Sequence, residues 1–388
     1  MPEKPNMEII FGTPALTAPP YTCNSDAKRQ TPDKKAHHGQ KIGAQIMRIT
    51  AVTCVKNEGP FLLEWIAYNR LLGVTDFLFY SNDCTDGTDA LLDAMADYGV
   101  VHLPNPAKGR NYQMEALKDS AHQSVVKQAD WIWIADVDEF LNIHTGDHTI
   151  PSLINACGNP HAISVTFQFM ANSGVDAFAD RPVIEQFNRT HNPDIWCGEL
   201  AQEVKTLIRS DFPLKYYGAH RPFFPDNLDK SQRPDWKDGS GNEVQPRFKI
   251  AANKRRIRKF PAKGVRELAT LNHYALRSLD SYLFKNDRGD VNRENRNFDD
   301  TYWRERNDQS WEDTSIHRYL PKLTEALAVM KADPKIGPLH EAAVAAHRET
   351  RDRLLTDEAY VSLRDRLKRL PTIPPKELEL IAMLERVA

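Results

Sequence analysis

Short β-branched and aromatic runs alternate with helix-type segments between residues 47 and 140, and this alternation constrains the fold more than any other feature. Repeated β-α-β units require a mainly parallel sheet with helices on both faces. We therefore predict an α/β, Rossmann-like fold. The predicted strands are 49–54, 77–80, 100–103 and 131–135, and the predicted helices are 60–72, 88–98 and 110–128.

The rest of the chain divides by composition. Further strands are expected at 162–169 and 204–208, a loop-rich stretch at 209–270, and charged helices from 310 on, with breaks near Pro334, Pro338 and Pro371. The predicted domains are a disordered leader at 1–46, a catalytic domain at 47–300 and a C-terminal helical extension at 301–388. Met47 directly precedes the first strand, so an alternative translation start there is a hypothesis.

Composition excludes several classes of protein. Lys and Arg number 51 against 53 Asp and Glu, a balance that indicates neither a nucleic-acid partner nor a membrane partner. No apolar run reaches the roughly 18–20 residues of a membrane span. Five cysteines, an odd number without a CxxC pair, indicate a reducing compartment. We expect a cytoplasmic protein, with contact at the inner face of the membrane left open.

The segment Asp136-Val137-Asp138-Glu139 follows the very apolar run Trp131–Ala135. Such a strand is buried, so its end places carboxylates at the edge of the sheet. In a turn, Asp136 and Asp138 can converge on Mg²⁺ or Mn²⁺, which prefer oxygen ligands and share them with diphosphates. The alternative is a solvated turn or a helix N-cap. The position after a buried strand favours the metal site.

Other polar segments follow the ends of neighbouring strands. Asn57 and Glu58 follow the first, Asp83 and Asp86 the second, and Gln113 comes after the third. In doubly wound sheets, ligands bind outside the carboxyl ends of the strands, so these segments converge on one crevice. Asp83 is favoured as a ligand contact and Asp86 as a helix cap. Glu58 is also explained as a charge at a helix N-terminus.

A second group of candidates lies beyond residue 200. His273 stands between a strand end and a helix that carries Lys285 and Arg288; imidazole completes a Mn²⁺ shell and the two cations suit a diphosphate. The aromatic, basic loop around His220 is a candidate acceptor surface or a packed loop. The basic run 254–259 is favoured as an exposed edge strand over an anion-binding patch.

Taken in order, these motifs resemble the family-2-like glycosyltransferases with a GT-A fold, in the branch shared by bacterial polysaccharide enzymes and eukaryotic transferases once classed as a domain of unknown function. The resemblance covers roughly residues 47–290. It is carried by Cys54–Glu58, Glu64-Trp65, Tyr68-Asn69, Asn82–Thr88, Gln113, Asp136–Phe140, Asn172–Gly174, His273-Tyr274, Lys285, Arg288 and Gly289.

The resemblance implies transfer of a sugar from a UDP- or GDP-sugar to a glycan or other hydroxyl acceptor, with inversion. Asp83 would lie near the nucleoside, Asp136 and Asp138 would hold the metal and diphosphate, and His273 would be a late metal ligand. An inverting reaction needs a general base. Four candidates remain open: Glu139, Asp176, Glu199 and Glu203.

Two other classes of function compete with this one. A nucleotidyltransferase uses a similar sheet and metal, but its first loop is rich in Gly and in basic residues that grip a triphosphate. Here that loop is Lys56-Asn57-Glu58-Gly59-Pro60, with an acid and one Gly. A non-catalytic glycan-binding module is the third class, and the intact Asp136 and Asp138 pair disfavours it. The released product distinguishes the three classes: a nucleoside diphosphate for the glycosyltransferase, pyrophosphate for the nucleotidyltransferase and no product for the binding module.

Overall fold

The fold is seen in a computed structural model, which describes residues 47–109, 111–192, 203–225, 227–250, 264–289 and 299–386. Its strands are β1 Ile49–Val55, β2 Asp76–Ser81, β3 Val100–Pro104, β4 Trp131–Ile134, β5 Glu139–Ile143, β6 Ala162–Phe169, β7 Arg189–Thr190, β8 Val204–Arg209, β9 Trp236–Asp238, β10 Ala269–His273 and β11 Trp311–Glu312. Its α-helices are α1 Gly59–Leu71, α2 Thr88–Ala94, α3 Tyr112–Ser120, α4 Ser124–Lys127, α5 Ile150–Ala156, α6 Val183–Gln186, α7 Pro246–Ile250, α8 Leu279–Arg288, α9 Asp300–Arg304, α10 Leu320–Ala332, α11 Ile336–Leu354, α12 Glu358–Lys368 and α13 Pro375–Glu385.

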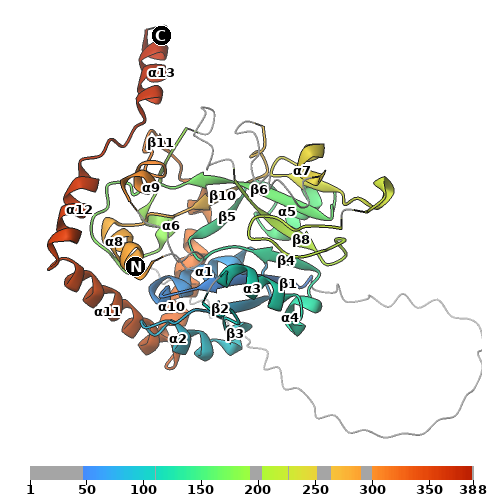
Figure 1. Ribbon diagram of the computed structural model, residues 1–388, viewed down its shortest axis with the longest axis horizontal. Helices are drawn as coiled ribbons and strands as arrows, with labels where there is room; N and C mark the ends of the chain where they lie inside the picture. The colour runs from blue at the N-terminus through green and yellow to red at the C-terminus, as the bar shows by residue number, and fades with distance from the viewer. Residues whose placement is uncertain are drawn as a thin grey trace, which may run out of the picture. The chain divides into compact units, whose positions relative to one another are not determined.

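The main sheet of the described residues has the strand order β3-β2-β1-β4-β8-β6-β10-β5, with β9 added beside β6 (Figure 1). β3, β2, β1 and β4 are all parallel, which confirms the predicted β-α-β half. β8 is antiparallel to both β4 and β6, and β5 is antiparallel to β10. The mixed, mainly parallel α/β sheet is the fold class that the sequence predicts.

Alternation along the central strands divides the core into two layers. Trp131 and Trp133 belong to one apolar cluster together with α1, whereas Ile132 and Ile134 belong to another with α3 and α4. Successive side chains of a strand point to opposite faces, so both faces of β4 are covered and all four of its residues are buried. Because β4 is packed on both faces, the position of the segment that follows it is fixed at the end of the strand.

Helix α1 is held against the sheet by side chains as well as by apolar packing. The indole Nε1 of Trp65 donates to the carbonyl of Glu139 at 3.1 Å, and the hydroxyl of Tyr68 donates to the carbonyl of Leu141 at 2.9 Å. Both contacts fix β5 against α1. The carboxylate of Glu64 accepts the N–H groups of Val183 and Ile184 at 2.7 and 3.1 Å, at the start of α6.

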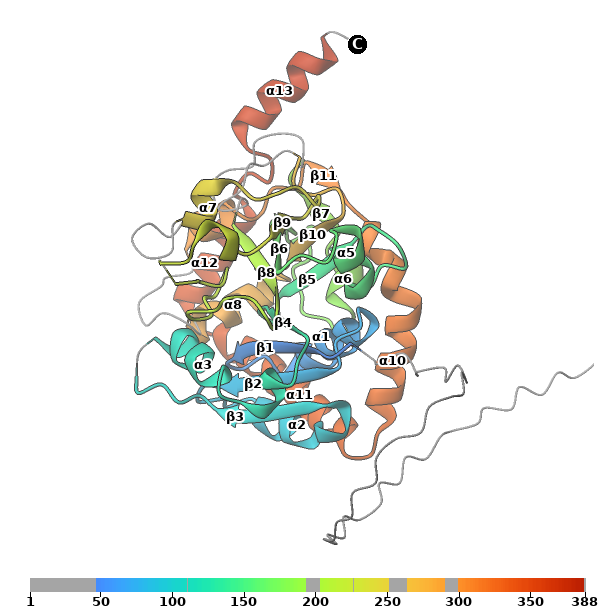
Figure 2. The same ribbon diagram turned by 90° about the vertical axis from the view of Figure 1, so that its right-hand side faces the viewer.

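The C-terminal helices α10 and α11 pack against α1, on the layer that contains Trp131 and Trp133 (Figure 2). Pro334 lies in the turn between the two helices, as predicted, but Pro338 lies inside the first turn of α11. A proline is tolerated there because the first N–H groups of a helix have no partner within it. The domain boundary predicted at residue 300 stays a prediction.

Several predicted elements differ in detail from the observed ones. The helix expected at 88–98 is α2 followed by a separate 3-10 turn, Ala96–Tyr98, and the helix expected at 110–128 is the pair α3 and α4. Strand β5, which begins at Glu139, was not predicted. The leader 1–46 and the basic run 254–259 lie outside the described residues. Among the helices that are described, none has the combined length and apolar character needed to cross a membrane.

Glu64 gives a test of how α1 is anchored. Replacing Glu64 with Ala removes the acceptors of two N–H groups at a buried position, and we expect the free energy of unfolding to fall by about 1–3 kcal/mol in urea titrations. Glu185→Ala removes only an exposed partner of Arg181 and is the matched control, with an expected change below about 1 kcal/mol. Equal losses in the two variants would contradict this role.

Candidate functional site

The acidic segment forms the turn between β4 and β5. The N–H of Glu139 donates to the carbonyl of Asp136 at 3.0 Å and closes the turn, while the N–H of Tyr274 donates to the carbonyl of Asp138 at 2.8 Å. The turn is thus fixed to β10 as well as to β4. The three carboxylates of the turn lie at the edge of the sheet that the sequence predicts, and they separate into two clusters.

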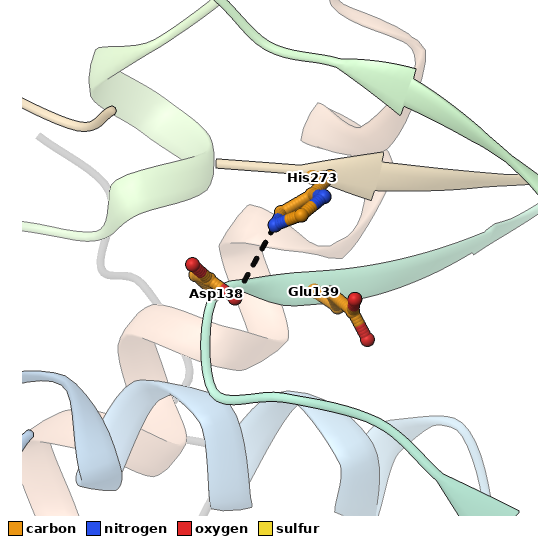
Figure 3. Close-up of side chains that lie close together, drawn as sticks. All are labelled: Asp138, Glu139 and His273. Carbon is orange, nitrogen blue, oxygen red and sulfur yellow. Dashed lines mark ion pairs between the residues drawn. The ribbon is translucent and has the colours of Figure 1, made fainter. Parts of the chain in front are cut away.

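Asp138 is the centre of the first cluster. Its Oδ1 lies 3.5 Å from Nε2 of His273 (Figure 3). Its Oδ2 accepts a hydrogen bond from Nζ of Lys285 at 3.0 Å. Burial opposes ionisation of Asp138, but Lys285 and His273 outweigh it and hold the pKa of this carboxyl well below its usual range. Burial lowers the pKa of His273 despite the neighbouring carboxylate, which favours neutral imidazole.

Asp136 belongs to the second cluster. Its Oδ2 lies 3.1 Å from Nζ of Lys205, which in turn lies 3.2 Å from Oε2 of Glu139. Gln113 donates to Oδ1 of Asp136 at 3.4 Å, so the structure brings this predicted residue to the acidic turn. Burial raises the pKa of Glu139 well above its usual value, and Asp136 and Asp138 add to the effect while Lys205 opposes it. Glu139 is therefore an internal partner of Lys205.

Glu58 is held by two arginines. Its carboxylate lies 2.7 Å from Arg277 and 2.6 Å from Arg288, and all three side chains are less than 10% exposed. Burial alone would raise the pKa of Glu58, but Arg277 and Arg288 lower it. Arg288 also donates to the carbonyls of Lys56 and Asn57. The structure thus places Glu58 and Arg288 in a clamp that joins the loop after β1 to α8.

The loops after β1 and β2 support each other. Oδ1 of Asn57 accepts the N–H of Thr85 at 2.7 Å, and the carboxylate of Asp86 accepts the N–H groups of Gly59 and Thr88, each at 3.0 Å. Asp86 therefore stabilises the starts of α1 and α2 and is buried. Asp83 is exposed and has a φ of 46°, a conformation that Asp tolerates better than most residues.

The base candidates lie in different surroundings. Glu203 directly precedes β8 and shares a face with Lys205, because alternate residues of a strand point the same way. Its Oε2 lies 3.7 Å from Nε2 of His220. The ring of Phe167 has its centroid 6.1 Å from that of His220 and 4.8 Å from that of His273. The ring of Phe167 thus contacts both imidazoles, and it links Glu203 and His220 to the His273 side of the Asp138 cluster.

The remaining candidates are placed otherwise. Asp176 forms an ion pair with Lys368 of α12 at 2.5 Å, so its partner is none of the residues that contact the acidic turn. Glu199 lies outside the described residues. Arg221, in the loop considered as acceptor surface, is 2% exposed, packs over Phe223 and donates to the carbonyl of Phe248 at 2.7 Å. These contacts support the packed-loop interpretation for Arg221.

Sequence reasoning missed two cations. Lys205 lies in the apolar strand Val204–Arg209, and Arg277 has a φ of 55° in the turn before α8. A lysine at an inward position of a buried strand is a recognisable signal, since it requires an anionic partner. Arg277 follows closely after the motif residues His273 and Tyr274, but its guanidinium packs 3.5 Å from the ring centroid of Phe61, a contact that no local pattern predicts.

Donor atoms from both clusters fit a divalent cation. One oxygen each of Asp138 and Glu139 and one nitrogen of His273 lie within 4.8 Å of one another. Carboxylate oxygens with one imidazole suit Mn²⁺ or Mg²⁺. Nδ1 of His273 is buried and finds no hydrogen-bond partner among the described residues. Asp136 is not in this group, so its predicted role as a metal ligand stays a prediction.

The Glu58 clamp gives a pH-dependent prediction. Glu58→Gln leaves two buried guanidinium groups without their anion, so we expect the free energy of unfolding at pH 7 to fall by about 3–5 kcal/mol. Because folding lowers the pKa of Glu58, its contribution is present above its ordinary value of 4.5 and is lost as the pH falls below it. In denaturant titrations, the difference in free energy of unfolding between wild type and Glu58→Gln should be smaller at pH 4 than at pH 7.

The matched control for the clamp is Glu115→Gln, which removes an exposed partner of Lys118. We expect a change below about 1 kcal/mol that is similar at both pH values. A gap for Glu58→Gln that widens on acidification would contradict the prediction.

Comparison with known proteins adds an independent observation. The sequence profile of glycosyltransferase family 92 matches residues 50–220. A solved structure, described as 4-diphosphocytidyl-2C-methyl-D-erythritol synthase from Anaerococcus prevotii, aligns with 43% of this chain and 73% of its own at 14% identity. Its TM-score is 0.25, too low to carry an argument.

Two plant proteins are similar over a shorter stretch. A glycosyltransferase family 92 protein of Ricinus communis is 27% identical over 99 residues, which is 24% of this chain, and one of Oryza sativa subsp. japonica is 29% identical over 105 residues, which is 26% of this chain. The matched part spans only 17% of the length of either relative. Both plant proteins carry the same family 92 description as the profile that matches residues 50–220 of this chain.

Proposed function

We propose that the protein transfers a sugar from a nucleoside diphosphate donor to a hydroxyl acceptor, at the acidic turn between β4 and β5. The observation that carries this proposal is the Asp138 cluster, in which a carboxylate, the imidazole of His273 and the ammonium of Lys285 meet at the carboxyl edge of the sheet. The family 92 similarity covers the same turn.

Asp138 and His273 are the residues proposed to hold a divalent cation, and Asp136 stays a candidate ligand. Such a cation would neutralise the charge that develops on the leaving diphosphate. Lys285 pairs with Asp138 and would offer a second positive charge to the same diphosphate. Asp83, Asn57 and Gln113 lie on the loops and helix around the turn, where the nucleoside and ribose hydroxyls are proposed to bind.

The proposed reaction inverts the anomeric carbon. The acceptor oxygen forms a bond to that carbon while the bond from the carbon to the diphosphate oxygen breaks, and the acceptor proton passes to a base. Glu203 is our candidate for that base. Of the three described candidates, Glu139 is internal and Asp176 is paired with Lys368, whereas the Glu203 side chain is 12% exposed beside His220.

Nucleotide binding tests the site directly. We expect UDP or GDP to bind in calorimetric titrations when Mn²⁺ is present and to bind at least about tenfold more weakly without it. Asp138→Asn should abolish the effect of Mn²⁺ while circular dichroism stays unchanged. Asp211→Asn, which changes an exposed partner of Arg209, is the control. If no nucleotide binds to the wild type, the proposed donor site is wrong.

The base assignment has its own test. Glu203→Gln keeps the size of the side chain but cannot accept a proton, so we expect kcat for transfer to fall by about 10²–10⁴-fold with little change in UDP affinity. Glu243→Gln, an exposed glutamate paired with Lys249, is the control. Activity within about threefold of wild type for Glu203→Gln would exclude Glu203 as the base.

A further inference from the structure

Lys205 is a lysine whose side chain lies almost wholly inside the protein, beneath the acidic turn. Its side chain is 1% exposed, and its Nζ bridges Oδ2 of Asp136 and Oε2 of Glu139 at 3.1 and 3.2 Å. A buried ammonium is unfavourable unless anions compensate it. The position of Lys205 on β8 is therefore matched to two carboxylates of a turn that lies some 70 residues earlier in the chain.

The three side chains of this cluster differ in exposure. Asp136 is 32% exposed, whereas Glu139 and Lys205 are each 1% exposed. Oε2 of Glu139 also accepts the backbone N–H of Asp136 at 2.9 Å. Lys205 and Glu139 thus hold the side chain and the backbone of Asp136 from the protein side, while its Oδ1 accepts a hydrogen bond from Gln113 and the side chain keeps part of its surface in solvent.

We propose that Lys205 is a positioning residue for the nucleotide site: it fixes the orientation of the Asp136 carboxylate and supplies a permanent positive charge beneath the bound diphosphate. This inference rests on the proposed function, because it concerns how that same site discriminates between anions and cations. Lys205 acts through Asp136 and through its charge.

The sign of the charge separates this role from a purely structural one. Without the ammonium, the site becomes one unit more negative, which favours a bound cation and disfavours a bound diphosphate. Loss of packing or of local order, by contrast, weakens both kinds of binding. The two roles therefore predict opposite changes in affinity for a divalent cation.

The test measures Mn²⁺ alone, and then UDP at saturating Mn²⁺, by calorimetry on wild type and Lys205→Met. For the variant we expect Mn²⁺ to bind about 3–10-fold more tightly and UDP about tenfold more weakly. Lys237 of β9 is a partly exposed lysine that pairs with Asp235, and Lys237→Met should leave both affinities unchanged. Weaker binding of both ligands to Lys205→Met, or no change in either, overturns the proposal.

Glu139→Gln supplies a second background, because it removes one of the two carboxyl groups that contact Lys205. The double variant Lys205→Met, Glu139→Gln carries no buried carboxylate at residue 139, and it serves where the single lysine variant fails to fold. Compared with Glu139→Gln alone, we expect it to bind UDP about 3–10-fold more weakly at saturating Mn²⁺. Equal UDP affinities in the two overturn the proposal.

Failure of the inference and failure of the proposed function give different results. If wild type binds neither UDP nor GDP in the presence of Mn²⁺, the proposed function fails and the role of Lys205 fails with it; if only GDP binds, GDP replaces UDP in every titration. If wild type binds UDP and the lysine variants shift both affinities in the same direction, only the role of Lys205 fails. Thermal unfolding of each variant confirms that a folded protein is being titrated.

Discussion

Buried carboxylates at one edge of the sheet impose the strongest constraint on this structure. Glu58, Asp138 and Glu139 are all nearly inaccessible, and an ionised carboxylate inside a protein is stable only with a positive partner. The partners come from β8 and from the segment around α8, far along the chain. These later segments therefore have to pack against the first β-α-β half.

The same constraint explains why the acidic turn holds two clusters. Asp136 and Asp138 are two residues apart, yet Asp136 pairs with Lys205 of β8 and Asp138 pairs with Lys285 of α8. Each aspartate thus meets a lysine on a different element. The arrangement keeps the turn ordered through protein contacts, and it leaves the Asp138 and His273 pair beside Lys285, with Glu203 and His220 beyond the ring of Phe167.

The parts of the fold that depend on local pattern were predictable. Strands β1 to β4 follow from runs of β-branched and aromatic residues, and the position of Asp136 and Asp138 at the sheet edge follows from the buried strand before them. The contacts of His273 and Lys285 with Asp138 agree with the grouping proposed from the sequence. The motif residues Trp65 and Tyr68 turned out to anchor β5 through hydrogen bonds to its carbonyls.

What could not be predicted depends on pairings between distant segments. Strand β5 pairs with β10, more than a hundred residues away, and the short acidic run before it gives no sign of a strand. Lys205 and Arg277 meet their carboxylates only because β8 and α8 reach the same edge. The spacing of such partners along the sequence follows no helix or strand period, so their contacts cannot be predicted from it.

The clamp on Glu58 also orders events during synthesis. Glu58 and its partner Arg277 are 219 residues apart. At ribosomal speeds of about 5–20 residues per second, the glutamate precedes the arginine by roughly 10–45 s. During that interval, β1, α1 and β2 have sequence enough to pair while the loop between β1 and α1 lacks its cationic support. The edge of the sheet that carries Glu58 is thus completed only when the last third of the chain arrives, so a nascent chain can form its first strands well before Glu58 gains its partner.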